Sequence, residues 1–123
     1  MPERKDLVIN TGPLIAILAA LNDLRVLEFL YRKVLVPFEV CQEIEAKGAA
    51  GFAVPQFKEA EWLHKWPTPL EISSFLLNSL DRGEAAVIQM TLKCGISTVF
   101  IDESAGRRVA RLNESEAHRR ASR

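Results

Sequence analysis

Four oxygen-bearing side chains occupy positions in the sequence from which they could act together on a cation. Asn10 and Asp102 each follow a run of apolar residues that predicts a buried β-strand. Glu43 and Glu84 lie in segments with helical periodicity, and Glu103 stands next to Asp102. Carboxylates within a few ångströms of one another repel, so such a cluster is stable at neutral pH only when it holds a metal or is well hydrated.

The residue types predict which cation would be held. Carboxylate and amide oxygens without His or Cys favour Mg²⁺ or Mn²⁺ over zinc. A divalent ion at this position would bind phosphate oxygens and would activate water for attack on a phosphodiester. Cys41 and Cys94 are isolated thiols without a C-x-x-C pattern. They predict neither a zinc site nor a disulfide, and they indicate a reduced, cytoplasmic protein.

Each of these oxygen-bearing residues also has a purely structural explanation. Glu84 lies near the start of a predicted helix, where an acid complements the helix dipole, and Glu43 could be a solvated surface residue. The Asn10 amide could cap the helix that begins in the Thr-Gly-Pro sequence after it. Asp102 is harder to explain in this way, because it follows an apolar strand at the point where α/β sheets keep their ligand sites.

The elements that would position these residues alternate between strand and helix. Strands are predicted at 7–10, 33–37, 61–66 and 97–102, helices at 13–21, 24–32, 37–48, 71–80 and 81–95, and a loop at 49–55. Strands separated by helices predict a parallel α/β sheet with right-handed crossovers. The segment 97–102 is continuously apolar and β-branched, as expected of a strand covered on both faces. The carboxyl ends of such strands share one edge, where Asn10 and Asp102 are expected to meet.

Composition predicts one globular domain with a charged tail. The 123 residues, 48% of them hydrophobic, suffice for a single core. Residues 1–103 carry 10 Lys and Arg against 14 Asp and Glu, whereas 104–123 carry 6 against 2. The apolar run 14–21 is too short to span a bilayer. It is also unlike a signal peptide, because mixed charges precede it and Pro13 interrupts it. No membrane association is expected.

Four stretches of the chain, in order, resemble the PIN domain family: VINTGPLIAI, VLVPFEVCQEI, LDRGEAAVI and VFIDESAGRRVA. They span about 7–110 and are most similar to a prokaryotic PIN-like branch of predicted nucleic-acid-binding proteins. The resemblance implies a three-layer α/β fold, with a central parallel sheet flanked by helices. It also implies a Mg²⁺- or Mn²⁺-dependent endoribonuclease for single strands, often the toxin of a toxin–antitoxin pair. Carried over by motif, the family's metal-site positions fall on Asn10, Glu43, Glu84 and Asp102, with Glu103 as a supplement.

Two features depart from the family pattern. Most active PIN nucleases carry Asp where this chain has Asn10, which still offers an oxygen but no charge. Family members also continue into a further strand and helix, whereas this chain ends in RLNESEAHRRASR. We therefore predict a PIN-like domain over 1–112 that lacks the last strand and helix, followed by a basic, disordered tail at 113–123. Such a truncation would leave a sheet edge uncovered.

These observations support two classes of function. The first is the metal-dependent endoribonuclease, a hydrolase of phosphodiester bonds. The alternative is a catalytically weak or inactive PIN-like module that binds RNA or a protein such as an antitoxin. A nucleotide-binding regulator is disfavoured because no Gly-rich phosphate loop follows any predicted strand. A homodimer is expected, since the Leu- and Phe-rich early helices should leave an apolar patch.

Overall fold

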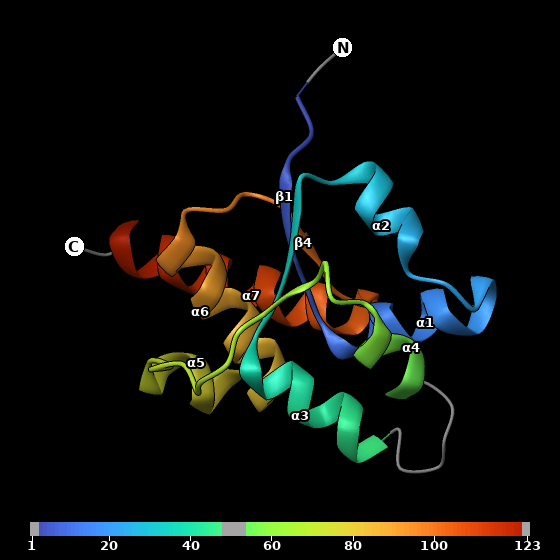
Figure 1. The fold of residues 1–123 in the computed structure, drawn as a ribbon. Coiled ribbons are helices and arrows are strands. Elements are labelled where there is room, and N and C mark those ends of the chain that lie inside the picture. Colours follow the sequence, from blue (N-terminus) through green and yellow to red (C-terminus); the bar gives the residue numbers. More distant parts are fainter. Residues whose placement is uncertain (1–2, 48–53, 122–123) are drawn as a thin grey trace.

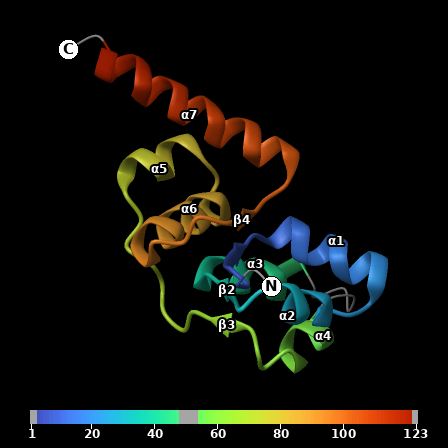
Figure 2. The same ribbon diagram turned by 90° about the horizontal axis from the view of Figure 1, so that it is seen from above.

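The strands of the protein form one parallel sheet, as the alternation of strands and helices predicted. The computed structural model describes residues 3–47 and 54–121. Within these residues the sheet has the strand order β3-β2-β1-β4 (Figures 1 and 2). The strands are β1 (Asp6–Ile9), β2 (Lys33–Val36), β3 (His64–Lys65) and β4 (Val99–Phe100). All pairings between neighbouring strands are parallel, so the carboxyl ends of the strands share one edge.

Helices cover both faces of this sheet. Figure 2 shows α1 and α2 on one side of the strands and α5 and α6 on the other. The helices are α1 (Thr11–Leu21), α2 (Arg25–Leu30), α3 (Phe38–Lys47), α4 (Val54–Glu59), α5 (Ser74–Ser79), α6 (Arg82–Cys94) and α7 (Glu103–Ala121). The predicted α/β fold, with a central parallel sheet flanked by helices, is confirmed.

The core is built around β1 and β2, whose apolar residues are buried on both faces of the sheet. Leu7, Val8 and Ile9 of β1 are fully buried. Val34 and Val36 of β2 are buried with them, and both strands belong to the main hydrophobic cluster. Burial on both faces explains why the last three residues of each strand are all apolar.

Strand β4 differs from the strand predicted at 97–102. The observed strand is limited to Val99–Phe100 and lies at the end of the sheet, paired with β1. Val99 is partly exposed and Phe100 is 39% exposed. The expectation of a strand covered on both faces was wrong, because an apolar run does not reveal how many elements will pack on it. In the part of the chain that the structure describes, no strand pairs with the outer edge of β4.

Helix α4 was not predicted from the sequence. The loop expected at 49–55 lies mostly outside the described residues, but its last two positions, Val54 and Pro55, begin α4. Pro55 is tolerated there because residues in the first helical turn need no backbone N–H partner. Six residues are too few for a stable helix in isolation. The buried Phe57 side chain, which joins the main core, therefore stabilises α4 through tertiary packing.

Helix α7 extends from Glu103 to Ala121. The tail at 113–123 was predicted to be disordered, and its residues up to 121 are instead part of this helix. The sequence after Gly106 contains no Gly or Pro that would stop a helix. The expected boundary at 112 thus falls inside a helix, and the division into a domain and a tail stays a prediction.

The first half of α7 is anchored on α5 and α6. Val109 and Leu112 of α7 pack on a second hydrophobic cluster, formed by Leu76, Leu80 and Ala85. This contact positions the side chains of the first two turns of α7 relative to the start of α6. Among the described helices, α7 included, none is long and apolar enough to cross a membrane.

Candidate functional site

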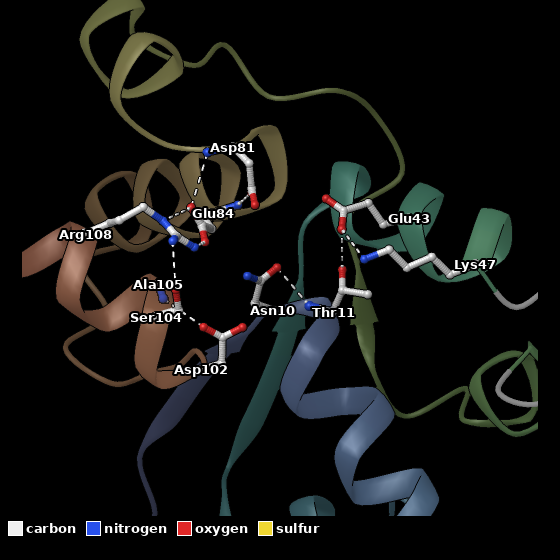
Figure 3. Close-up of polar contacts among 10 residues, drawn as sticks. All are labelled: Asn10, Thr11, Glu43, Lys47, Asp81, Glu84, Asp102, Ser104, Ala105 and Arg108. Atoms are coloured by element: carbon white, nitrogen blue, oxygen red, sulfur yellow. Dashed lines mark hydrogen bonds and ion pairs between the residues drawn. The ribbon is translucent and has the colours of Figure 1, made fainter.

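Asn10 lies at the carboxyl end of β1 and begins helix α1 (Figure 3). Its backbone N–H donates to the Phe100 carbonyl of β4 (3.0 Å), and its side-chain Oδ1 accepts from the Thr11 N–H (2.8 Å). Asn10 is 7% exposed. The predicted role of Asn10 as a helix cap is confirmed, and this role holds its amide oxygen at the carboxyl edge of the sheet.

Asp102 also caps a helix, and only one of its carboxylate oxygens serves that purpose. Oδ1 accepts from the Ala105 N–H (2.8 Å) in the first turn of α7. Oδ2 faces the start of α1 and lies 3.3 Å from the point that a Cβ on Gly12 would occupy. Since Oδ2 accepts no hydrogen bond from the described residues, it is a charged oxygen available to a cation or to water.

Glu43 reaches Asn10 from helix α3 because Gly83 leaves room for it. The Glu43 Oε2 accepts from the Thr11 hydroxyl (3.1 Å) and lies 3.8 Å from the Lys47 Nζ. A Cβ on Gly83 would overlap the Glu43 Oε1 and would lie 3.2 Å from the Asn10 Oδ1. The two oxygens therefore converge on the same point above the first turn of α6.

Glu84 lies at the same edge of the sheet, but its carboxylate pairs with an arginine rather than with the other candidate residues. It forms a capping box with Asp81, in which Oε1 accepts from the Asp81 N–H (3.2 Å). Arg108 of α7 donates from Nε to the same oxygen (3.0 Å) and from Nη2 to Oε2. This contact raises the pKa of the Arg108 guanidinium above its ordinary value. Glu84 is 3% exposed, so it is a buried carboxylate neutralised by arginine.

Glu103 is exposed and pairs with a residue outside the candidate set. Its side chain is 85% exposed and lies 3.2 Å from the Arg107 Nη1, one turn further along α7. The structure therefore brings Asn10 and Glu43 together and sets Asp102 at the same edge. Glu84 and Glu103 instead contact arginines.

The donor set of Asn10, Glu43 and Asp102 fits a hard divalent cation. All three offer oxygen, and the absence of a side chain at Gly83 lets the Glu43 carboxylate lie beside the Asn10 amide oxygen. Mg²⁺ is commonly bound through one or two carboxylates, with water and phosphates completing its shell. Within residues 3–47 and 54–121, no three His, Cys, Asp or Glu side chains form a group that could hold a metal. An ion held here would therefore take most of its ligands from water and phosphate.

Three residues of this edge were not singled out from the sequence. Two of them are Thr11, which orients Glu43, and Gly83, which makes room for it. Each is a sequence neighbour of a predicted site residue. Gly83 could have been noticed in the sequence, because a glycine directly before an acid in the first turn of a helix is a place where another side chain can approach closely. No feature of the sequence indicated Arg108, because its contact with Glu84 joins residues 24 positions apart.

Comparison with known proteins identified a family. A family model described as a PIN domain matches residues 6–119. No curated protein and no solved structure matches the chain. The matched range includes every candidate residue described above.

Proposed function

The chain belongs to the PIN domain family, and from this premise we propose that it is a nuclease-like module that cleaves single-stranded RNA with Mg²⁺ or Mn²⁺. The observation that carries the proposal is the convergence of the Asn10 Oδ1 and the Glu43 Oε1 above Gly83. Asp102 supports it, because its Oδ2 lies at the same edge and accepts no hydrogen bond from the described residues.

In this proposal Asn10, Glu43 and Asp102 hold the divalent ion. The ion, when bound, supplies positive charge for phosphate oxygens and lowers the pKa of water. Asn10 is neutral and cannot take up a proton, so its part is limited to ligation and orientation. Thr11 fixes the Glu43 Oε2 through its hydroxyl, which leaves Oε1 to face the ion beside the Asn10 Oδ1.

Cleavage of RNA by the natural chain tests this proposal. We expect a single-stranded RNA oligonucleotide to be cut in the presence of Mn²⁺ and to remain intact in EDTA. The same sequence annealed to its complement serves as the control, and we expect it to be cut more slowly. Equal degradation with and without metal would indicate a contaminating nuclease, and no cleavage at any metal concentration would contradict the proposal.

The alternative is a catalytically weak or inactive module that binds nucleic acid or protein. Two observations favour it: Asn10 lacks a charge, and Arg108 neutralises Glu84. Binding of the RNA without cleavage would be its signature.

Membership of a toxin–antitoxin pair, with an antitoxin protein as partner, is a further part of the proposal.

The proposal also includes a homodimer. It is supported by large apolar side chains that are exposed at the end of α1, on α2 and on β4: Leu21 (57%), Phe29 (78%), Leu30 (53%) and Phe100 (39%). Exposed apolar patches of this kind mark contact surfaces when they are contiguous.

Substitution of Gly83 tests the convergence directly. We expect Gly83→Ala to weaken Mn²⁺ binding by about tenfold, because the new Cβ displaces the Glu43 carboxylate. The fold should be unaffected, since the atoms in conflict end a flexible side chain and Ala is favoured in helices. Gly106→Ala on α7, where a Cβ meets no atom within 4 Å, is the matched control. Calorimetry of both variants would contradict the arrangement if their affinities were equal.

A further inference from the structure

The ion pair of Arg108 and Glu84 differs from the other ion pairs of the described residues. Its carboxylate is 3% exposed, whereas the acids of the other pairs are between 21% and 85% exposed. A buried carboxylate is costly unless a counter-charge and hydrogen bonds compensate it. Arg108 supplies both.

The ion pair is bidentate, and a further hydrogen bond within α7 holds the Arg108 guanidinium in position. Nε and Nη2 of Arg108 each donate to a different oxygen of Glu84. Nη1 donates to the Ser104 hydroxyl one turn earlier on α7 (2.8 Å), which holds the guanidinium in place. The Asp81 N–H adds a third donor to Glu84. Such fork contacts are among the stronger charge-assisted hydrogen bonds in proteins.

We infer that Arg108 is an internal counter-cation of Glu84, and that this ion pair and a divalent ion compete for the Glu84 carboxylate. The inference rests on the proposed function, because it concerns the metal held by Asn10, Glu43 and Asp102. Figure 3 shows Glu84 and Arg108 on one side of Asn10 and Glu43 on the other. A guanidinium there repels a second cation and occupies the oxygens that would ligate it.

The Arg108 side chain can dissociate from Glu84 into solvent. Its side chain is 39% exposed, so it can move into solvent without displacing the core. Glu84 cannot follow, because it is buried and fixed in the capping box of α6. Release of Arg108 would therefore expose a charged, preoriented carboxylate at the carboxyl edge of the sheet.

A purely structural pair, which only stabilises the junction of α6 and α7, makes different predictions. It would not affect the affinity for metal. Arg107 and Glu103 provide a matched comparison, because they form an ion pair on the same helix with both partners exposed.

The test compares Mn²⁺ binding by calorimetry, and thermal unfolding with and without Mn²⁺, in the natural chain and four variants. Arg108→Gln should bind Mn²⁺ about tenfold more tightly than the natural chain, because a cation is removed and a carboxylate is freed. Its thermal midpoint should fall without metal and recover with it. Glu84→Gln should bind Mn²⁺ no more tightly than the natural chain, because it leaves the Arg108 charge without its counter-charge. The double variant should lose the gain of Arg108→Gln. Arg107→Gln is the control and should behave as the natural chain. Arg108→Lys replaces Arg108→Gln if the latter does not fold, with a smaller gain in the same direction.

The outcomes separate this inference from the proposed function. Equal affinity in the natural chain and in Arg108→Gln would overturn the competition while leaving the metal site intact. A gain in Arg108→Gln that persists in the double variant would overturn it as well, since the freed Glu84 carboxylate would then not be the cause of the gain. An absence of Mn²⁺ binding in the natural chain and every variant would refute the proposed function together with the inference.

Discussion

Asp102→Asn is expected to weaken Mn²⁺ binding by about 100-fold or more and to remove RNA cleavage, while the thermal midpoint without metal stays unchanged. The substitution neutralises Oδ2, the carboxylate oxygen that accepts no hydrogen bond from the described residues. It keeps an oxygen in the place of Oδ1, which accepts from the Ala105 N–H. Asn and Asp are comparable helix caps, so the start of α7 should be preserved. Calorimetry and a cleavage assay measure the two effects.

Asp81→Asn is the matched control for this substitution. Asp81 caps α6 as Asp102 caps α7, and both caps accept a backbone N–H at 2.8 Å. Asp81 is not among the proposed ligands, so its substitution should leave Mn²⁺ affinity unchanged. Equal losses in the two variants would mean that Asp102 acts through the fold or through general charge, and the proposed metal site would be wrong.

Asn10→Asp is expected to have opposite effects with and without metal. A carboxylate at this position would keep accepting the Thr11 N–H, but its charge would lie against Glu43 in a place that is 7% exposed. Without metal, about 1 kcal/mol of repulsion would lower the thermal midpoint by roughly 4 °C. With Mn²⁺ the added charge becomes a ligand, so affinity should rise by about tenfold and the midpoint should recover.

Asn22→Asp provides the comparison for Asn10→Asp. Asn22 ends the same helix, and its Oδ1 accepts from the Gln56 side chain (3.0 Å), far along α1 from the candidate site. We expect no gain in Mn²⁺ affinity from this variant. If the midpoint of Asn10→Asp falls and Mn²⁺ does not restore it, the cluster is not a metal site and Asn10 serves only as a cap.

Local features of the fold could be predicted because their causes lie within a few residues. The last three residues of β1 and of β2 are all apolar, and burial on both sheet faces requires that composition. The cap role of Asn10 follows from the Thr-Gly-Pro sequence after it, and Gly95 ends α6 in the left-handed conformation that favours glycine. Helix α4 and the exposure of β4 could not be predicted, because both depend on which surfaces meet in the folded chain.

The sequence by itself determined which residues stand at the carboxyl ends of the strands. Asn10 and Asp102 each follow a strand, and parallel strands bring their carboxyl ends to one edge. Only the tertiary structure decided which charges the candidate residues face. Gly83 admits Glu43 because α3 packs on α6, and Arg108 reaches Glu84 because α7 packs on α5 and α6. Periodicity records which face of an element is buried, whereas contacts across elements depend on the packing of distant segments, which no local pattern encodes.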